Sequence, residues 1–150
     1  MLEIGNKAPE FILPDQDGND VSLSDFAGKK VVVWFFPKAS TPGWTVEGQG
    51  FRDELQNFKS KNVVVIGMSA DSSKRQKNFC DKQNFEYPML SDEGKNVLKL
   101  YGVWGTKKMY GREYEGIYRY TYIIDEKGLI EKAYKKVSVK THAKEVLADL

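Results

Sequence analysis

Cysteine and histidine are almost absent from this sequence, which has one of each, Cys80 and His142. A single cysteine excludes a disulfide bond within the chain. No cluster of cysteine and histidine is present that could hold a zinc ion. We interpret His142 as an ordinary isolated histidine without a special role.

Long hydrophobic runs and one-signed charge blocks are also lacking. The longest apolar run, residues 31–36, is far too short to cross a bilayer, and residues 1–7 have no signal-peptide pattern. The 23 basic and 21 acidic residues are interspersed, so no concentrated basic surface is indicated for nucleic acid. We therefore expect a cytoplasmic protein that binds neither membranes nor nucleic acids.

The size and composition are those of a protein that folds unaided. The chain has 150 residues, of which 41% are hydrophobic and 29% charged, and it has no low-complexity segment. A chain of this length buries enough apolar surface to fold without disulfides or metals. We expect a single domain over residues 1–150.

Hydrophobic patterns predict a parallel strand–helix–strand unit in the first half of the chain. Residues 30–36 and 62–70 are rich in β-branched residues, as in strands covered on both faces. Residues 46–59 between them have the apolar spacing of an amphipathic helix. We also expect a turn at 15–19 between short strands, helices at 72–82 and 93–101, and an extended segment at 88–90.

The C-terminal part has a different pattern. Residues 118–125 and 129–135 flank the turn residues Glu126, Lys127 and Gly128, which predicts an antiparallel hairpin, and residues 142–150 predict a closing helix. A mixed central sheet flanked by helices follows. This order of elements is that of the α/β thioredoxin-like fold, although the order alone leaves other small α/β folds open.

The loop at residues 37–44 follows the first buried strand, where α/β sheets place their ligands. Thr41 is suited to cap the next helix, and Pro42 to occupy its first position. Position 44 then lies in the first helical turn, where the helix dipole and free backbone N–H groups favour an anion. The alternative interpretation is a helix start without further function.

The segment Pro37-Lys38-Ala39-Ser40-Thr41-Pro42-Gly43-Trp44 resembles the Pro-x-x-x-Thr-x-x-Cys signature of peroxiredoxins, in the form found in the bacterioferritin comigratory (Q-type) class. Residues 5–11, 87–92, 101–104, 108–111, 116–121 and 135–139 also resemble segments of that family, in the same order. The similarity therefore extends over nearly the whole chain.

The resemblance implies roles for three residues around a cysteine that attacks peroxide and becomes a sulfenic acid. Pro37 would shield the loop, and Thr41 would hydrogen-bond a substrate oxygen. Arg119 would stabilise the thiolate and the charge that develops during O–O cleavage. The alternatives are that Thr41 only caps its helix, and that Arg119, on an aromatic strand, points to solvent and pairs with a carboxylate.

The second cysteine of the family, which resolves the sulfenic acid, has two known positions. Gln49 occupies one of them in this sequence, whereas Cys80 lies in a segment that resembles the other, on the second helix. The resemblance therefore implies that Cys80 is the resolving residue. A buried hydrophobic role is the alternative for a lone helical cysteine.

Trp44 stands where the family has its peroxide-attacking cysteine, and indole has no thiol chemistry. Three explanations are open: a laboratory replacement, a recoded selenocysteine with Cys80 as its partner, and a natural pseudoenzyme. We also expect the bulky indole to push the first helical turn toward an unwound conformation.

The family implies reduction of hydrogen peroxide and organic hydroperoxides, with thioredoxin or a similar dithiol protein as reductant. It implies no cofactor, whether metal, haem or flavin, and a monomer. With Trp44 as written, we expect the chain to be inactive. A non-catalytic thioredoxin-fold module, which binds or senses a partner through exposed aromatic residues, is the alternative function.

Overall fold

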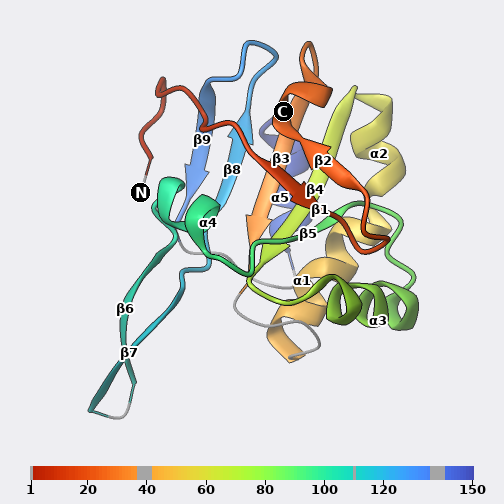
Figure 1. Cartoon of the computed structure of the whole chain (residues 1–150). Helices are drawn as coiled ribbons and strands as arrows, with labels where there is room; N and C mark the ends of the chain where they lie inside the picture. Colours follow the sequence, from red (N-terminus) through yellow and green to blue (C-terminus); the bar gives the residue numbers. More distant parts are fainter. Residues whose placement is uncertain (1, 37–41, 110, 136–140) are drawn as a thin grey trace.

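A five-stranded mixed sheet forms the centre of the computed structural model, which describes residues 2–36, 42–109, 111–135 and 141–150 (Figure 1). Its strands are β3 (Lys30–Phe35), β4 (Val63–Ser69), β5 (Met89–Ser91), β8 (Thr121–Ile124) and β9 (Ile130–Tyr134). They lie in the order β5-β4-β3-β8-β9. Pairing is parallel among β3, β4 and β5 and antiparallel from β3 to β8 and from β8 to β9, which confirms the predicted mixed sheet.

Alternate residues of β3 enter two separate hydrophobic clusters, one on each face of the sheet. Val31 and Val33 belong to one cluster, and Val32 and Trp34 to the other. Successive side chains of a strand point to opposite faces. Both faces of β3 are therefore covered, which explains why its sequence is a continuous apolar run.

Most of the helices cover the second of these faces. Its cluster receives side chains from α1 (Pro42–Asp53), α2 (Leu55–Ser60), α3 (Ser73–Gln83) and α5 (His142–Ala148). The other face is covered by α4 (Asn96–Leu100), by the N-terminal hairpin of β1 (Ile12–Pro14) and β2 (Asp20–Ser22), and by the short 3₁₀ helix η1 (Leu23–Phe26). The turn predicted at 15–19 joins β1 and β2.

The helix predicted at 46–59 is two helices, and the first of them also includes the turn that starts at Pro42, as the loop sequence predicts. α1 begins at Pro42, and Glu54, with φ −96° and ψ 4°, separates it from α2. Phe51, Leu55 and Phe58 are all buried in one cluster across the break. The apolar spacing therefore continues through both helices, which is why the sequence pattern does not reveal the interruption.

The helix predicted at 93–101 is shorter, because α4 begins only at Asn96. Lys95 has a left-handed backbone, with φ 64°, and its N–H donates to the carbonyl of Asp92 in a turn. The carboxylate of Asp92 then accepts a hydrogen bond from the N–H of Leu98 at 2.8 Å. A turn stabilised in this way replaces the first helical turn.

A hairpin of β6 (Trp104–Met109) and β7 (Arg112–Ile117) was not predicted. It extends away from the body of the protein (Figure 1). Charged residues such as Lys108 and Glu113 are exposed in the ribbon, and among its described residues Ile117 alone is buried, so the sequence shows no regular alternation of apolar and polar residues. The strand predicted at 118–125 is correspondingly shorter and begins at Thr121.

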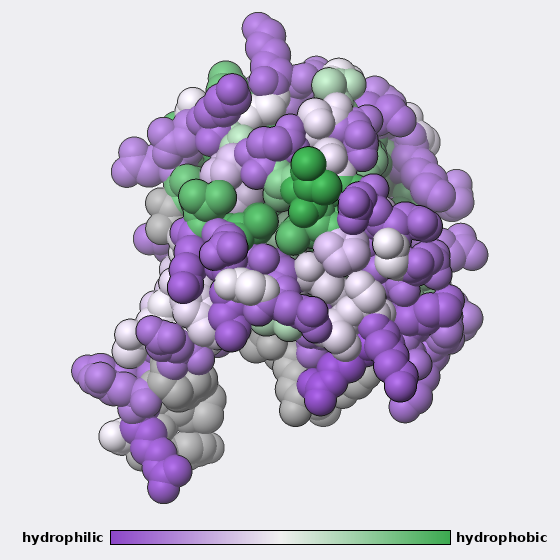
Figure 2. Space-filling model, in the orientation of Figure 1, coloured by the Kyte–Doolittle hydropathy of each residue, from purple (hydrophilic) through white to green (hydrophobic). Residues whose placement is uncertain are grey.

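The surface is mostly hydrophilic in the view of Figure 2, with one hydrophobic area over α4 and β1. Leu100 and Ile12 are more than half exposed there. Among the residues that the structure describes, no helix is long and apolar enough to cross a membrane.

Two glycines of α1 provide a matched test of how tightly this helix packs. A Cβ atom on Gly48 would lie 2.6 Å from the buried Phe85 ring, whereas on Gly50 it would lie 3.4 Å from the Cβ of Ala143. We expect Gly48→Ala to lower the free energy of unfolding by about 1–3 kcal/mol through overpacking. Gly50→Ala should raise it by about 0.5–1 kcal/mol through helix propensity. Urea denaturation of the two variants measures both, and equal effects would contradict the close packing of α1 on Phe85.

Candidate active site

The carboxyl end of β3 leads to α1, where the site is predicted. The structure describes only some of the predicted site residues. Pro37 and Thr41 lie outside the described residues, so the roles expected of them stay predictions. Trp44 lies in the first turn of α1, and its side chain is outside the described part of the structure. Because α1 is helical from Pro42 onward, the expected unwinding of this turn is wrong; proline is favourable at a first helical position.

Arg119 lies just before β8, not within a strand as expected. The backbone N–H of Phe35 donates to the carbonyl of Tyr120, and Trp34 is the register partner of Thr121. Arg119 is therefore next to the carboxyl end of β3. Its side chain is 33% exposed, and its Nη2 lies 3.6 Å from Oε2 of Glu47. The alternative interpretation, in which Arg119 pairs with a carboxylate at the surface, holds only in part, because the carboxylate partner Glu47 lies in the protein interior.

Glu47 is the residue that sequence reasoning missed. It lies on α1, three residues after position 44 and therefore on the same side of the helix, and it is only 2% exposed. Burial raises the pKa of its carboxyl to about 7, although the nearby Arg119 opposes the shift. The sequence did contain a signal for Glu47: it is a carboxylate on the apolar face of the helix that follows the reactive position.

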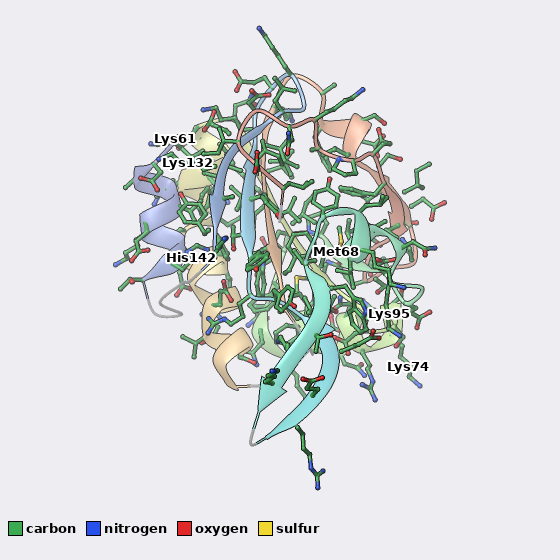
Figure 3. The ribbon with its side chains drawn as sticks, turned by 90° about the vertical axis from the view of Figure 1, so that its left-hand side faces the viewer. Lys61, Met68, Lys74, Lys95, Lys132 and His142 are labelled. Carbon is green, nitrogen blue, oxygen red and sulfur yellow. The ribbon has the colours of Figure 1, made fainter. Side chains whose placement is uncertain are left out.

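His142 lies at the start of α5 (Figure 3). It is fully buried, and it lies beside Glu47. Its Nε2 lies 2.9 Å from Oγ1 of Thr121 and 3.9 Å from Oε1 of Glu47. Burial, with a smaller contribution from Arg119, lowers the pKa of the imidazole to about 4. The ring is therefore neutral at physiological pH, and its approach to Glu47 is not an ion pair.

Cys80 lies in α3 and is only 4% exposed, within the hydrophobic cluster that includes Phe79 and Phe85. Burial is the main reason that the pKa of its thiol is raised to about 12, and nearby carboxylates such as Asp81 add to the effect. The thiolate is the reactive form of cysteine. In this conformation Cys80 is therefore unreactive, and any reaction requires α3 to open.

Polar contacts hold α3 to α1 near the end of both helices. The Gln49 amide donates to Oε1 of Gln83 at 2.7 Å, and Nη1 of Arg52 donates to the Gln83 carbonyl at 2.9 Å. Gln49 occupies one of the two family positions for a resolving cysteine. Here its side chain ties α1 to the helix that contains Cys80.

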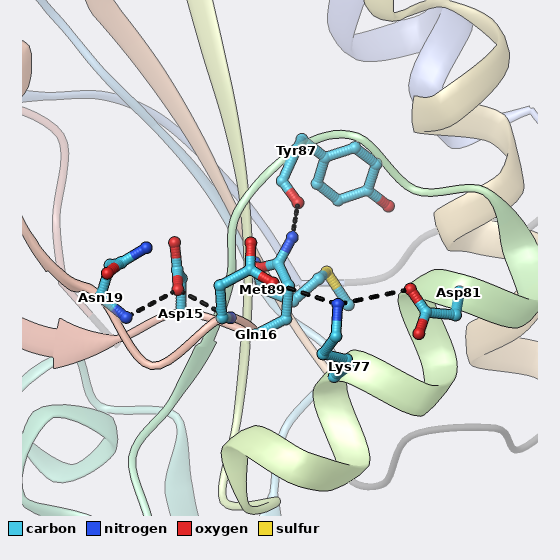
Figure 4. A network of polar contacts seen from close by, with 8 residues as sticks. Asp15, Gln16, Asn19, Lys77, Asp81, Tyr87 and Met89 are labelled. Carbon is cyan, nitrogen blue, oxygen red and sulfur yellow. Dashed lines mark hydrogen bonds and ion pairs between the residues drawn. The ribbon is translucent and has the colours of Figure 1, made fainter.

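A second network holds the outer side of α3 to the β1–β2 turn (Figure 4). Nζ of Lys77 lies 3.2 Å from Asp17 and 3.7 Å from Asp81. The Gln16 side chain donates to the carbonyl of Tyr87 and accepts from the N–H of Met89. Of these contacts the Lys77–Asp17 pair joins α3 to the turn, whereas Asp81 lies on α3 itself and the Gln16 bonds hold the turn to β5 and the residue two positions before it. A single exposed ion pair contributes little stability, so it restrains α3 without preventing its local opening.

Comparisons with known proteins identify the family. The model of the AhpC/TSA family matches residues 4–133. Peroxiredoxin Bcp of Escherichia coli is 42% identical over 146 residues, which are 97% of this chain and 94% of that protein. A putative peroxiredoxin of Mycobacterium tuberculosis is 42% identical over 149 residues, covering 99% and 95% of the two chains.

Solved structures agree with the sequence relatives. PrxQ of Xylella fastidiosa, solved as a cysteine-to-serine mutant, has a TM-score of 0.93 and 34% identity over 99% of this chain and 95% of that one. The bacterioferritin comigratory protein of Xanthomonas campestris has a TM-score of 0.88 and 37% identity over 93% and 88%. The expected thioredoxin-like fold is confirmed. This chain belongs to the AhpC/TSA family, and its relatives and structural neighbours are peroxiredoxins of the Bcp and Q type.

Proposed function

We propose that this chain has the scaffold of a thiol peroxidase that reduces hydrogen peroxide and organic hydroperoxides, with Trp44 at the position of the attacking residue. The single observation that supports this most strongly is the placement of Arg119 against α1, 3.6 Å from a carboxylate three residues after position 44. A cation beside the first turn of a helix is the environment that stabilises a thiolate.

The proposed reaction begins with a thiolate at position 44. Its sulfur attacks the distal peroxide oxygen, an S–O bond forms, the O–O bond breaks, and the leaving oxygen takes a proton to become water or an alcohol. Cys80 then attacks the sulfenic sulfur and releases water, and a dithiol protein such as thioredoxin reduces the disulfide. Pro37 and Thr41 would shield and orient the peroxide, and no cofactor takes part.

The indole of Trp44 cannot perform the first step, so the chain as written is proposed to be inactive. The codon for position 44 separates two of the explanations for Trp44: UGA indicates selenocysteine read as tryptophan, and UGG a genuine tryptophan. We also propose a single-domain monomer located in the cytoplasm.

Trapping of a sulfenic acid tests the proposal directly. The Trp44→Cys/Cys80→Ser variant is treated with one equivalent of hydrogen peroxide and then with dimedone, and the adduct is located by mass spectrometry. We expect modification at position 44. A folded variant that gives no adduct would overturn the proposed function.

A further inference from the structure

The buried imidazole of His142 has a fixed position, determined by three other elements. Its ring meets Phe51 of α1 edge-on, with centroids 5.7 Å apart, and Tyr134 of β9 in the same way at 5.2 Å. Thr121 of β8 provides the hydrogen-bond partner at 2.9 Å. A ring held from three sides cannot turn away from Glu47, so the 3.9 Å approach of Nε2 to Oε1 is a built feature of the fold.

The surroundings of the two ring nitrogens place the proton on Nε2. Nε2 faces two oxygens, whereas Nδ1 is buried and has no hydrogen-bond partner among the residues that the structure describes. A proton on Nδ1 would leave a buried N–H without an acceptor, which costs more free energy than leaving Nδ1 as an acceptor without a donor. With the proton on Nε2, the N–H donates to Thr121, and the positive end of its dipole lies beside the Glu47 carboxyl group.

Few other groups in the described part of the chain stabilise the charge of Glu47. Among the described residues, Oε2 of Glu47 has no hydrogen bond and only the ion pair with Arg119 at 3.6 Å. The other titratable groups near this cluster, among the described residues, are three. They are the phenol of Tyr134 against the His142 ring and the buried phenol of Tyr87, whose pKa values burial raises, and Lys107, whose pKa is lowered mainly by burial and also by Arg119. The ionised carboxyl therefore depends on Arg119 and on the N–H of His142.

We propose that His142 is a positioning residue: its Nε2–H, held by Thr121, stabilises the ionised form of the Glu47 carboxyl group and keeps this group in place, and Glu47 in turn places Arg119 beside position 44. The inference rests on the proposed function, because Arg119 matters only if position 44 reacts. It extends the proposed site from the loop and strand end to the C-terminal helix, and it gives the isolated histidine a role.

The titration of the Glu47 carboxyl group tests this arrangement, and it needs no substitution at position 44. We label glutamate with carboxyl ¹³C, follow its NMR titration, and assign the Glu47 signal by its loss in Glu47→Gln. His142→Phe keeps the ring but removes the N–H, so the midpoint should move upward by about one pH unit, a tenfold change in protonation. His142→Gln, which restores an N–H donor, should recover part of the shift.

Lys30→Gln is the matched control, because Lys30 pairs with Glu131 at 2.9 Å at the start of β3, the opposite end of that strand from Arg119. It should lower the thermal midpoint without moving the Glu47 titration. An equal shift in Lys30→Gln and His142→Phe, or none in a folded His142→Phe, would overturn the role of His142.

A second measurement separates this inference from the proposed function. In the Trp44→Cys background, the pH profile of the reaction with hydrogen peroxide should move in His142→Phe by the same amount as the Glu47 titration. If Trp44→Cys does not react at all, the proposed function fails, whereas the NMR result stands alone. If it reacts and the profile does not move, the positioning role fails.

Discussion

The Trp44→Cys variant is expected to consume hydrogen peroxide at least about a thousandfold faster than the chain as written, with thioredoxin or dithiothreitol as reductant. The step that indole cannot perform is nucleophilic attack, and loss of the nucleophile in covalent catalysis costs factors of this size or larger. The introduced thiol would lie in the first turn of α1, on the side of the helix that has Glu47 and Arg119. The rate is measured from peroxide loss in the steady state.

Two further variants determine which residues support this activity. Arg119→Leu in the Trp44→Cys background should lower the rate by at least about tenfold, because the guanidinium charge no longer stabilises the thiolate. Cys80→Ser should leave the first turnover intact but abolish recycling by thioredoxin. Unchanged recycling without Cys80 would show that it is only a buried hydrophobic residue, as its 4% exposure also allows.

Cys80 reacts only if α3 opens, so the disulfide step should depend on the contacts that hold this helix. The Gln49 and Arg52 bonds to Gln83 would have to break or shift. We expect the barrier to the proposed disulfide step to lie in this local opening, which would also remove the burial that raises the pKa of the thiol to about 12.

The second large effect concerns stability against pH, where Glu47 and His142 act in opposite directions. The carboxyl pKa rises from 4.5 to about 7 on folding, so the folded state holds a proton that the unfolded state releases, and stability falls as pH rises through this window. The imidazole pKa falls from 6.5 to about 4, so the unfolded state holds the extra proton and stability rises with pH between these values. Each full shift corresponds to about 3 kcal/mol.

The two contributions nearly cancel in the chain as written between about pH 4.5 and 6.5, and single variants should separate them. Glu47→Gln leaves only the histidine, so its free energy of unfolding should rise by about 3 kcal/mol from pH 4 to 6.5. His142→Phe leaves only the carboxyl, so its stability should fall by a similar amount from pH 4.5 upward. Urea denaturation at half-unit steps measures both slopes, and parallel curves for the two variants would contradict the opposite shifts.

The sequence by itself determined the family and the main sheet. Continuous β-branched runs at 30–36 and 62–70 predict β3 and β4, because strands covered on both faces need apolar residues at every position. The signature around Trp44 likewise identifies the family and the start of α1. These features are local, so neighbouring residues are enough to reveal them.

Only the tertiary structure brought Glu47, Arg119 and His142 together. Arg119 lies 72 residues after Glu47 (119 − 47) and His142 lies 95 residues after it (142 − 47), and no periodicity connects the three. The β6–β7 ribbon was missed because its sequence shows no regular alternation of apolar and polar residues, and the break at Glu54 because the apolar pattern continues across it. Burial, which shifts the pKa of Glu47 upward and that of His142 downward, arises from packing between α1, α5 and the sheet, and residue order alone does not specify that packing.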